Sequence, residues 1–366
     1  FMSGVPGSEL LKTAVHGRRD RKVIVMTGRP SIASSLEALR AGAWDYLPKP
    51  FSATQLRLLV GRAAHEAVAA RDPRPAGDAG VRDPAEEALL VGNSPIFRGV
   101  VSLARTVAAT DASVFITGPS GSGKEVIAQL IHRVSRRRTR DIVAINCAAL
   151  PEPLLESEMF GHVKGAFTGA TRDKAGLMEV ADGGTLFLDE LTEMSPMTQA
   201  KLLRVVQDGV VRRVGSSQSD AVVNVRYISA TNRDPEQAIA DGKLREDLYY
   251  RLGVVPIQLP ALRERPDDIP LLAEHFLTTY WVRHRGVEHP PPRLTPAARS
   301  ELLSRPWQGN IRELQNVMEH AIVLLGDHDE IDVGDLPSSG ARLPGEFPLQ
   351  GSYLGDGVPL SGYQRT

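Results

Sequence analysis

The sequence has little of several features that would mark a special environment. It contains one cysteine, Cys147, so no disulfide can form within the chain, and this favours a reducing, cytoplasmic compartment. No apolar run approaches the ~18 residues needed to cross a bilayer, and residues 1–7 lack the basic and apolar stretches of a secretory signal. The net charge of −1 gives no overall positive field for nucleic acid. These absences predict a cytoplasmic protein without a membrane partner.

The chain is long enough for more than one folding unit, at 366 residues. Strand patterns at 23–26 and 44–47 alternate with helical patterns at 32–41 and 54–70, which predicts a parallel sheet near the N-terminus. We predict five segments: an α/β unit at 1–70, a linker at 71–87, a larger α/β unit at 88–262, a helical unit at 263–336, and a flexible tail at 337–366.

A glycine-rich loop lies between a predicted strand at 114–117 and a predicted helix at 125–134. The loop reads Gly118-Pro119-Ser120-Gly121-Ser122-Gly123-Lys124 and fits the G-x-x-x-x-G-K pattern. Glycines allow backbone N–H groups to surround phosphate oxygens, and the helix N-terminus and the lysine add positive charge. Glu125 follows, where Ser or Thr is usual for Mg²⁺. The pattern predicts nucleotide binding; the alternative is a Gly/Ser loop with a solvated lysine.

Two acids end another apolar strand. Asp189 and Glu190 follow residues 184–188 and lie 65 residues after Lys124. Beside the phosphate loop they form the predicted Mg²⁺ site, with Asp189 on the ion or its waters and Glu190 polarising the attacking water. The alternative is a polar cap on a strand. The strand at 223–229 leads to Asn232, whose amide can contact a terminal phosphate and a water together, although Thr-Asn is also ordinary turn chemistry.

One hexapeptide carries a family resemblance: residues 165–170 read Gly165-Ala166-Phe167-Thr168-Gly169-Ala170, or GAFTGA. This string is the signature of the sigma-54-dependent bacterial enhancer-binding proteins, NtrC-like response regulators within the AAA+ ATPases. The chain resembles that family over about 88–336, and further matching stretches follow in the family's order: 145–150, 244–252, 260–265, 267–270 and 306–314. The resemblance implies a P-loop AAA+ fold, with a three-layer α/β subdomain at 88–262 and a helical lid at 263–336. In this family glutamate commonly follows the loop lysine, which accounts for Glu125.

The resemblance also implies residue roles. Lys124, Asp189 and Glu190 resemble the catalytic core for ATP and Mg²⁺, and Asn146 resembles the residue that holds the catalytic glutamate in an inactive pose. Arg245 and Arg251 resemble arginine fingers that reach a neighbouring subunit's nucleotide, and Arg312 resembles the sensor arginine of the lid. An inserted arginine is worth roughly 10³–10⁵ in rate, so hydrolysis would depend on a ring homo-oligomer, expected to be a hexamer. The alternative for the finger arginines is salt bridging with neighbouring acids on a helix.

The GAFTGA segment brackets one large apolar side chain, Phe167, between Gly165 and Gly169. Glycines give conformational range, and an exposed phenylalanine is costly to solvate unless it meets a partner. By resemblance that partner is sigma-54, with Thr168 as a companion contact. The alternative is a turn whose phenylalanine packs back into the core.

Residues 1–70 resemble part of a flavodoxin-like receiver domain, in which Thr27, Tyr46 and Lys49 match the switch threonine, aromatic residue and lysine. The phosphoacceptor aspartate would fall before Phe1, so the sensor kinase is expected to act on the intact protein. Residues 340–366 show no helix-turn-helix pattern, so enhancer DNA is expected to bind through a domain absent here. The basic run at 136–138 favours a solvated loop over a DNA site.

The predicted function is ATP-dependent activation of sigma-54 RNA polymerase, in which the GAFTGA loop remodels the closed promoter complex to the open one. Two alternatives remain: another AAA+ remodelling ATPase, such as an unfoldase or a loader, and a regulatory module that binds ATP without turnover. The presence of Glu190 argues against the second, because a pure binder can dispense with that acid.

Overall fold

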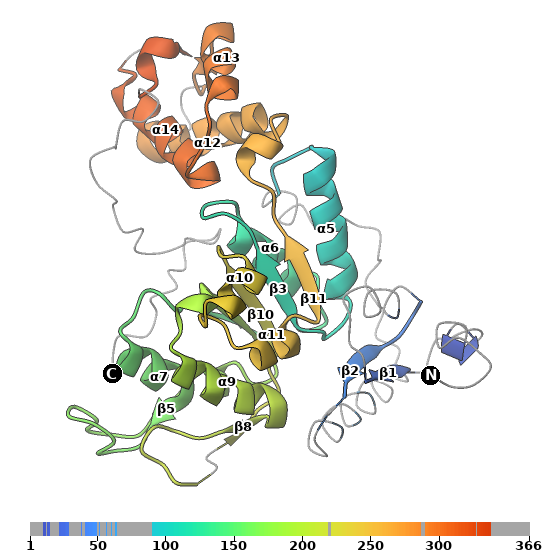
Figure 1. Ribbon diagram of the computed structural model, residues 1–366. Coiled ribbons are helices and arrows are strands. Elements are labelled where there is room, and N and C mark those ends of the chain that lie inside the picture. The colour runs from blue at the N-terminus through green and yellow to red at the C-terminus, as the bar shows by residue number, and fades with distance from the viewer. Residues whose placement is uncertain are drawn as a thin grey trace.

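The structure is a computed structural model (Figure 1). It describes residues 90–337, except 219–220, 287–289 and 327, together with scattered residues between 10 and 63. The predicted linker at 71–87, most of the predicted helices at 32–41 and 54–70, and the predicted tail from residue 338 onward lie outside the described residues.

A five-stranded parallel sheet forms the centre of the larger unit, in the order β11-β3-β10-β7-β4. The strands are β3 (Val114–Thr117), β4 (Ile142–Asn146), β7 (Thr185–Asp189), β10 (Arg226–Thr231) and β11 (Val255–Gln258). The predicted class, an α/β fold with a parallel sheet, is confirmed. One predicted strand starts too early: β10 begins at Arg226 rather than Val223. The N–H of Val223 donates to Gly209 O and that of Asn224 donates to Asp182 Oδ1, so these residues belong to the connection between β9 and β10.

Both faces of this sheet are covered by helices. Along β7, Leu186 and Leu188 belong to one apolar cluster and Phe187 to another, as the alternation of side chains along a strand requires. Helices α7 (Glu152–Phe160), α9 (Pro196–Asp208) and α11 (Glu246–Leu252) contribute to the first cluster, and α5 (Pro95–Ala108) and α6 (Lys124–Arg133) contribute to the second. The result is three layers with a core on each side of the sheet. Two short helices, α8 (Leu177–Val180) and α10 (Pro235–Ala240), complete this unit.

Several helices begin at a hydroxyl or carboxylate cap followed by proline. Ser94, Ser195 and Asp234 each accept a hydrogen bond from a backbone N–H in the first turn of the helix that follows, and each precedes a proline. These caps occupy N–H groups that have no partner within the helix, and proline at the first position has no N–H to leave unpaired. Local sequence therefore fixes where α5, α9 and α10 start.

The C-terminal part of the described chain is a separate helical unit with its own apolar cluster. It contains α12 (Asp268–Arg285), α13 (Pro296–Ser304) and α14 (Asn310–Leu324), with a short parallel pair, β12 (Arg293–Leu294) and β13 (Glu330–Ile331). Figure 1 shows this lid at one end of the α/β unit, reached by the chain that leaves β11. Trp307, at 1% exposure, is the largest fully buried side chain of its core.

Two small hairpins extend from the α/β unit at the end away from the lid (Figure 1). One pairs β5 (Gly161–His162) with β6 (Lys174–Ala175), and the other pairs β8 (Val210–Val211) with β9 (Ala221–Val222). The N–H of Val163 donates to Val214 O, which joins the bases of the two hairpins. The GAFTGA segment lies in the loop of the first hairpin.

The described residues near the N-terminus include a parallel pair, β1 (Ile24–Thr27) and β2 (Asp45–Pro48). The N–H of Lys49 donates to Thr27 O, so these two predicted switch positions lie at neighbouring strand ends, while Tyr46 lies within β2. This segment contacts the α/β unit: Leu11 and Ala43 belong to an apolar cluster against which Val254 packs.

The basic run after α6 is only partly solvated, which corrects the sequence-based expectation. Arg137 is 8% exposed, pairs with Asp111 at 3.0 Å, and donates to the carbonyls of Gly184 and Asn224. Arg136 lies over the Trp44 ring at 5.6 Å. Arg137 therefore joins strand ends from inside the protein. In the part of the chain that the structure describes, no helix is long and apolar enough to cross a bilayer.

Candidate functional site

A cavity of about 550 Å³ lies between the α/β unit and the lid. The ends of β4 and β7 and the loop after β3 contribute to its walls, which is where parallel α/β sheets commonly bind ligands. Predicted site residues from four different segments meet there: Ser120 to Glu125, Asn146, Asp189 with Glu190, and Arg312. Three lid residues to which the sequence analysis assigns no role also line the cavity: Arg265, His275 and Ile311.

The glycine-rich loop after β3 is closely packed. Gly118, Gly121 and Gly123 all have positive φ, at 155°, 73° and 102°, and a Cβ at Gly118 would lie 2.9 Å from the carbonyl oxygen of Leu259. Side chains are excluded from such conformations and spaces, which explains the glycines. Lys124 begins α6 and curls back over the loop, with Nζ donating to Gly118 O at 3.0 Å. The lysine side chain therefore joins the two ends of the loop through this hydrogen bond.

Three charged side chains face one another in this cavity. Lys124 Nζ lies 3.9 Å from Glu190 Oε1, and Asp189 is the adjoining residue at the end of β7. Burial lowers the pKa of Lys124, with the two acids opposing the change, and burial raises the pKa of both Asp189 and Glu190, with Lys124 opposing it. Each charge is therefore costly to hold in this setting, as in many sites that bind a charged ligand.

Glu190 is held in an unusual backbone conformation, with φ at 51°. Its N–H donates to Asp189 Oδ1 at 3.0 Å, and its Oε2 accepts from the backbone N–H of Asn232 at 3.3 Å. A left-handed conformation in a non-glycine residue costs about 1 kcal/mol or more and is found mostly where geometry serves a site. The backbone of Asn232 therefore contacts Glu190, while the predicted contact of its side-chain amide with a terminal phosphate and a water stays a prediction.

Asn146 stands beside Asp189, because the two residues are register partners at the ends of β4 and β7. Its Oδ1 accepts a hydrogen bond from the N–H of Ala148 at 2.9 Å. Among the described residues no hydrogen bond joins Asn146 to Glu190. The role of Asn146 as a restraint on that glutamate stays a prediction.

The three predicted arginines divide into two groups. Arg312 lines the cavity, and its Nη1 donates to Ser120 Oγ at 3.2 Å. Arg245 and Arg251 do not line it. The Arg245 side chain is 43% exposed and pairs with Asp247, Nη2 to Oδ2 at 2.8 Å, so the salt bridge weighed as an alternative is present. Burial lowers the pKa of Arg251, with Asp208 opposing the change.

The residues present fit a nucleotide-bound Mg²⁺. Within the described chain no group of three or more His, Cys, Asp and Glu side chains is arranged to hold a metal alone. Mg²⁺ with a nucleotide needs only one or two carboxylates, since phosphates and waters supply the remaining ligands. Asp189 lies in the cavity opposite Lys124, with a carboxyl whose pKa is raised by burial, so a cation there would offset the cost of its charge.

The loop that carries Phe167 contrasts with the phosphate loop. Gly165 and Gly169 have φ values of 83° and 107°, and a Cβ at either would have nothing within 4 Å. The loop closes through the N–H of Gly165, which donates to Ala170 O at 2.9 Å. Phe167 is 39% exposed and its ring meets His162 edge-on, with centroids 5.0 Å apart. The Phe167 side chain is therefore neither fully exposed to solvent nor buried in an apolar core.

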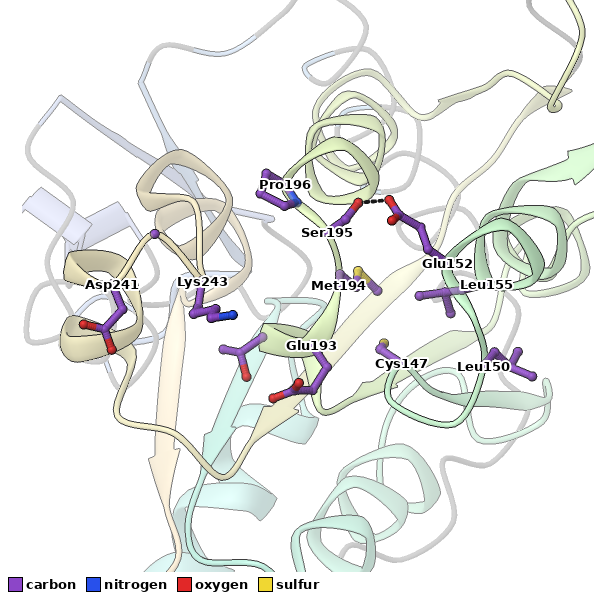
Figure 2. A pocket seen from close by; sticks show the side chains of 12 residues that line it. Cys147, Leu150, Glu152, Leu155, Glu193, Met194, Ser195, Pro196, Asp241 and Lys243 are labelled. Atoms are coloured by element: carbon purple, nitrogen blue, oxygen red, sulfur yellow. Dashed lines mark hydrogen bonds between the residues drawn. The ribbon is translucent and has the colours of Figure 1, made fainter.

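A second cavity, of about 320 Å³, lies beyond the turn that follows Glu190 (Figure 2). Figure 2 shows Ser195 pointing toward Glu152, to which it donates a hydrogen bond, while Glu193 and Lys243 lie across the cavity. The residues that line it include the cap of α9 and the first residue of α7, but no glycine-rich loop, and the carboxylates of Glu152, Glu193 and Asp241 beside these helix ends would repel phosphate. The first cavity is therefore the better nucleotide site.

Comparison with known proteins agrees with this geometry. The family described as Sigma-54 interaction domain matches residues 90–258, and the AAA+ ATPase lid domain matches residues 263–343. The transcriptional regulatory protein ZraR of Salmonella typhimurium is 43% identical over 343 residues, which cover 92% of this chain and 73% of that protein. The regulatory protein LuxO of Vibrio parahaemolyticus is 43% identical over 333 residues, which cover 90% and 71%.

Solved structures extend the likeness to the fold. NtrX from Brucella abortus, in complex with ADP, has a TM-score of 0.63 and 35% identity, over 91% of this chain and 74% of that one. The same protein in complex with ATP has a TM-score of 0.62 over the same shares. With the phosphate loop, the strand-end acids and the helical lid in place, this chain belongs to the sigma-54-dependent, NtrC-like response regulators, a branch of the AAA+ ATPases.

Proposed function

We propose that this protein hydrolyses ATP in a ring of identical subunits and uses residues 165–170 to act on sigma-54 until the closed promoter complex opens. Mg²⁺ bound at Asp189 would neutralise charge on the phosphates and orient them. A sensor kinase and enhancer DNA are proposed partners of the intact protein, the latter through a domain outside this chain.

One observation carries this proposal: the chain path ties both ends of the loop-bearing segment to the nucleotide cavity. The segment leaves the cavity at Asn146, passes through α7 into the β5–β6 hairpin, and returns along β7 to Asp189. Asn146 and Asp189 are register partners on adjacent strands. A small change at the cavity would therefore act on both ends of the segment, and packed elements respond to such changes by shifting between discrete arrangements.

The side chains support a division of chemical work. Lys124, freed from the loop carbonyls, can contact a terminal phosphate oxygen as a point charge, and its loss of hydration by burial strengthens that contact. Glu190 accepts from the Asn232 N–H, which leaves its other oxygen toward Lys124 to orient a water. Arg312 closes the site from the lid.

Arg245 supports a shared site between neighbouring subunits. It is exposed, carries its charge next to Asp247, and lies outside the cavity of its own chain. A neighbour's arginine inserted at the transition state accelerates phosphoryl transfer by roughly 10³–10⁵. Hydrolysis per subunit should therefore rise steeply with protein concentration. Mixing Lys124→Ala with Arg245→Ala protein should restore part of the activity that each lacks alone, because mixed interfaces contain one intact copy of both groups.

The central test is binding to sigma-54 in the presence of an ATP transition-state mimic. Phe167→Ala should keep ATP hydrolysis and lose sigma-54 capture. The matched control is Val323→Ala, which truncates an apolar side chain of the lid that is 57% exposed. This variant should keep both ATP hydrolysis and sigma-54 capture. Hydrolysis without any sigma-54 capture by the wild type would contradict the proposed partner and favour another remodelling ATPase. Absence of turnover at every protein concentration would contradict the proposed reaction.

A further inference from the structure

The lid contacts the peptide carbonyls of the phosphate loop. Three successive carbonyl oxygens of the loop each accept one hydrogen bond from the lid. Asn310 Nδ2 donates to Ser120 O at 2.9 Å, the backbone N–H of Ile311 donates to Gly121 O at 3.0 Å, and Arg265 Nη2 donates to Ser122 O at 2.8 Å. These donors come from two separate lid segments, before α12 and at the start of α14.

The loop's other carbonyls are also occupied. Gly118 O and Pro119 O accept from Lys124, and Gly123 O accepts from the N–H of Ile127. In a planar trans peptide, the N–H of the next residue points opposite to the C=O. Holding the carbonyls of Ser120 and Ser122 on the lid side therefore turns the N–H groups of Gly121 and Gly123 the other way. Inward N–H groups are what bind phosphate in a loop of this kind.

The lid turn is built to make these contacts. Asn310 has φ at 53° and Trp307 has φ at 47°, while the Trp307 ring is buried and its Nε1 donates to Leu302 O. A left-handed conformation at a bulky tryptophan is rare and persists only where its surroundings impose it. A Cβ at Gly121 would clash with the carbonyl oxygen of Gly309, so the two backbones are in close contact.

Each of the two lid side chains is tied to a second partner. Asn310 Oδ1 accepts from the N–H of Leu262, where the α/β unit meets the lid. Arg265 is 1% exposed, lies over the Phe97 ring at 4.8 Å, and has Nη1 4.0 Å from Asp268. Asp268 in turn accepts from the N–H and hydroxyl of Ser94, the cap of α5. A change in the lid's position would therefore be transmitted to the loop carbonyls.

We propose that Asn310 and Arg265 are positioning residues that set the peptide orientation of the phosphate loop, so that nucleotide affinity depends on the lid's position. This goes beyond the proposed hydrolysis and rests on it only in placing the nucleotide at Lys124. Because coupling between two equilibria is reciprocal, bound nucleotide must also hold the lid turn in place.

The test uses Asn310→Asp, which keeps the shape, the tolerance of positive φ and the oxygen for Leu262, but replaces the donor to Ser120 O with an acceptor. Affinity for ADP should fall about 10-fold, since a lost hydrogen bond is accompanied by repulsion between oxygens. The charge control is Gln308→Glu, which adds a nearby carboxylate while leaving the donor to Ser120 in place, and it should keep ADP affinity within about two-fold. Arg265→Lys keeps the charge but not the fork, and should weaken ADP several-fold.

Hydrogen exchange supplies a readout that a merely structural role would not move. In the wild type, ADP should slow exchange at the Ile311 amide, whose acceptor is a loop carbonyl, and in Asn310→Asp this protection should be lost. Unchanged ADP affinity in Asn310→Asp and Arg265→Lys, or equal loss in Gln308→Glu, would overturn the proposal. If Lys124→Ala also binds ADP normally, the nucleotide site itself is wrong; if only Lys124→Ala loses ADP, the site stands and the lid contact does not matter.

Discussion

The two glycine-rich loops of this protein use the same residue for opposite purposes. Gly121 in the phosphate loop sits against the Gly309 carbonyl, and its own carbonyl is bonded to the lid. Gly165 and Gly169 also have positive φ, yet a Cβ at either would meet nothing within 4 Å. In the first loop glycine permits close packing that fixes the backbone. In the second it permits backbone conformations that no neighbour imposes, which suits a segment that must change position.

A glycine motif therefore does not by itself indicate flexibility. Binding phosphate requires N–H groups that are already oriented, so rigidity lowers the cost of binding. A contact element that acts through movement requires few fixed neighbours. Five substitutions, in four experiments, test this contrast.

The largest effect is expected from Lys124→Ala. This change removes the point charge for phosphate and the donor to the carbonyls of Gly118 and Pro119. ATP hydrolysis should fall by about 10²–10³-fold, as for loss of other preorganised electrostatic groups. The control is Lys164→Ala, an exposed lysine beside the other loop, which should leave hydrolysis unchanged. An equal loss of ATP hydrolysis in both variants would contradict the proposed difference between the two loops.

The next effect compares alanine at one glycine of each loop. Gly121→Ala should lower stability by about 3 kcal/mol, because a clash with Gly309 adds to the cost of positive φ. That corresponds to roughly 6–12 °C in Tm, and ADP binding should weaken with it. Gly169→Ala should lower stability by only about 1 kcal/mol, with ADP binding unchanged. Thermal unfolding with and without ADP measures both, and similar shifts would contradict the contrast.

A smaller effect concerns the buried charges of the phosphate-loop site. Burial raises the folded-state pKa of Glu190 above its ordinary value of 4.5. The folded protein therefore keeps this proton to higher pH than the unfolded chain, and stability falls as pH rises through that window. Glu190→Gln removes the titration, so nucleotide-free protein should be about 1 kcal/mol more stable at neutral pH, or roughly 2–4 °C in Tm. The difference should vanish below pH 4.5, and a variant less stable than the wild type at neutral pH would contradict it.

The smallest effect tests the neighbour of Phe167. His162→Ala removes the edge-on ring contact at 5.0 Å, worth about 0.5–1.5 kcal/mol. Amide exchange in residues 163–173 should rise by up to about 10-fold, while ATP hydrolysis should stay within two-fold. Unchanged exchange would mean that the ring contact does not restrain the loop.

Much of the site could be predicted because its signals are local. The phosphate loop is a strand, a glycine-rich turn and a helix in one run, and Asp189-Glu190 follow an apolar strand directly. The sequence alone does not indicate a role for Arg265 and Asn310, although both lie in stretches that carry the family resemblance. Their partners are 143 and 190 positions away, and no local pattern records which carbonyl a side chain will reach across that distance.

By itself the sequence determined the parallel α/β class, the phosphate loop, the acids and the exposed-phenylalanine segment, because helix and strand periodicity and glycine spacing are written residue by residue. Only the tertiary structure decided that the Asn232 backbone donates to Glu190, that Arg137 is buried, and that the lid donates hydrogen bonds to the loop's carbonyls. These depend on where distant backbones meet, since hydrogen-bond partners of buried groups are chosen by the packing of whole elements.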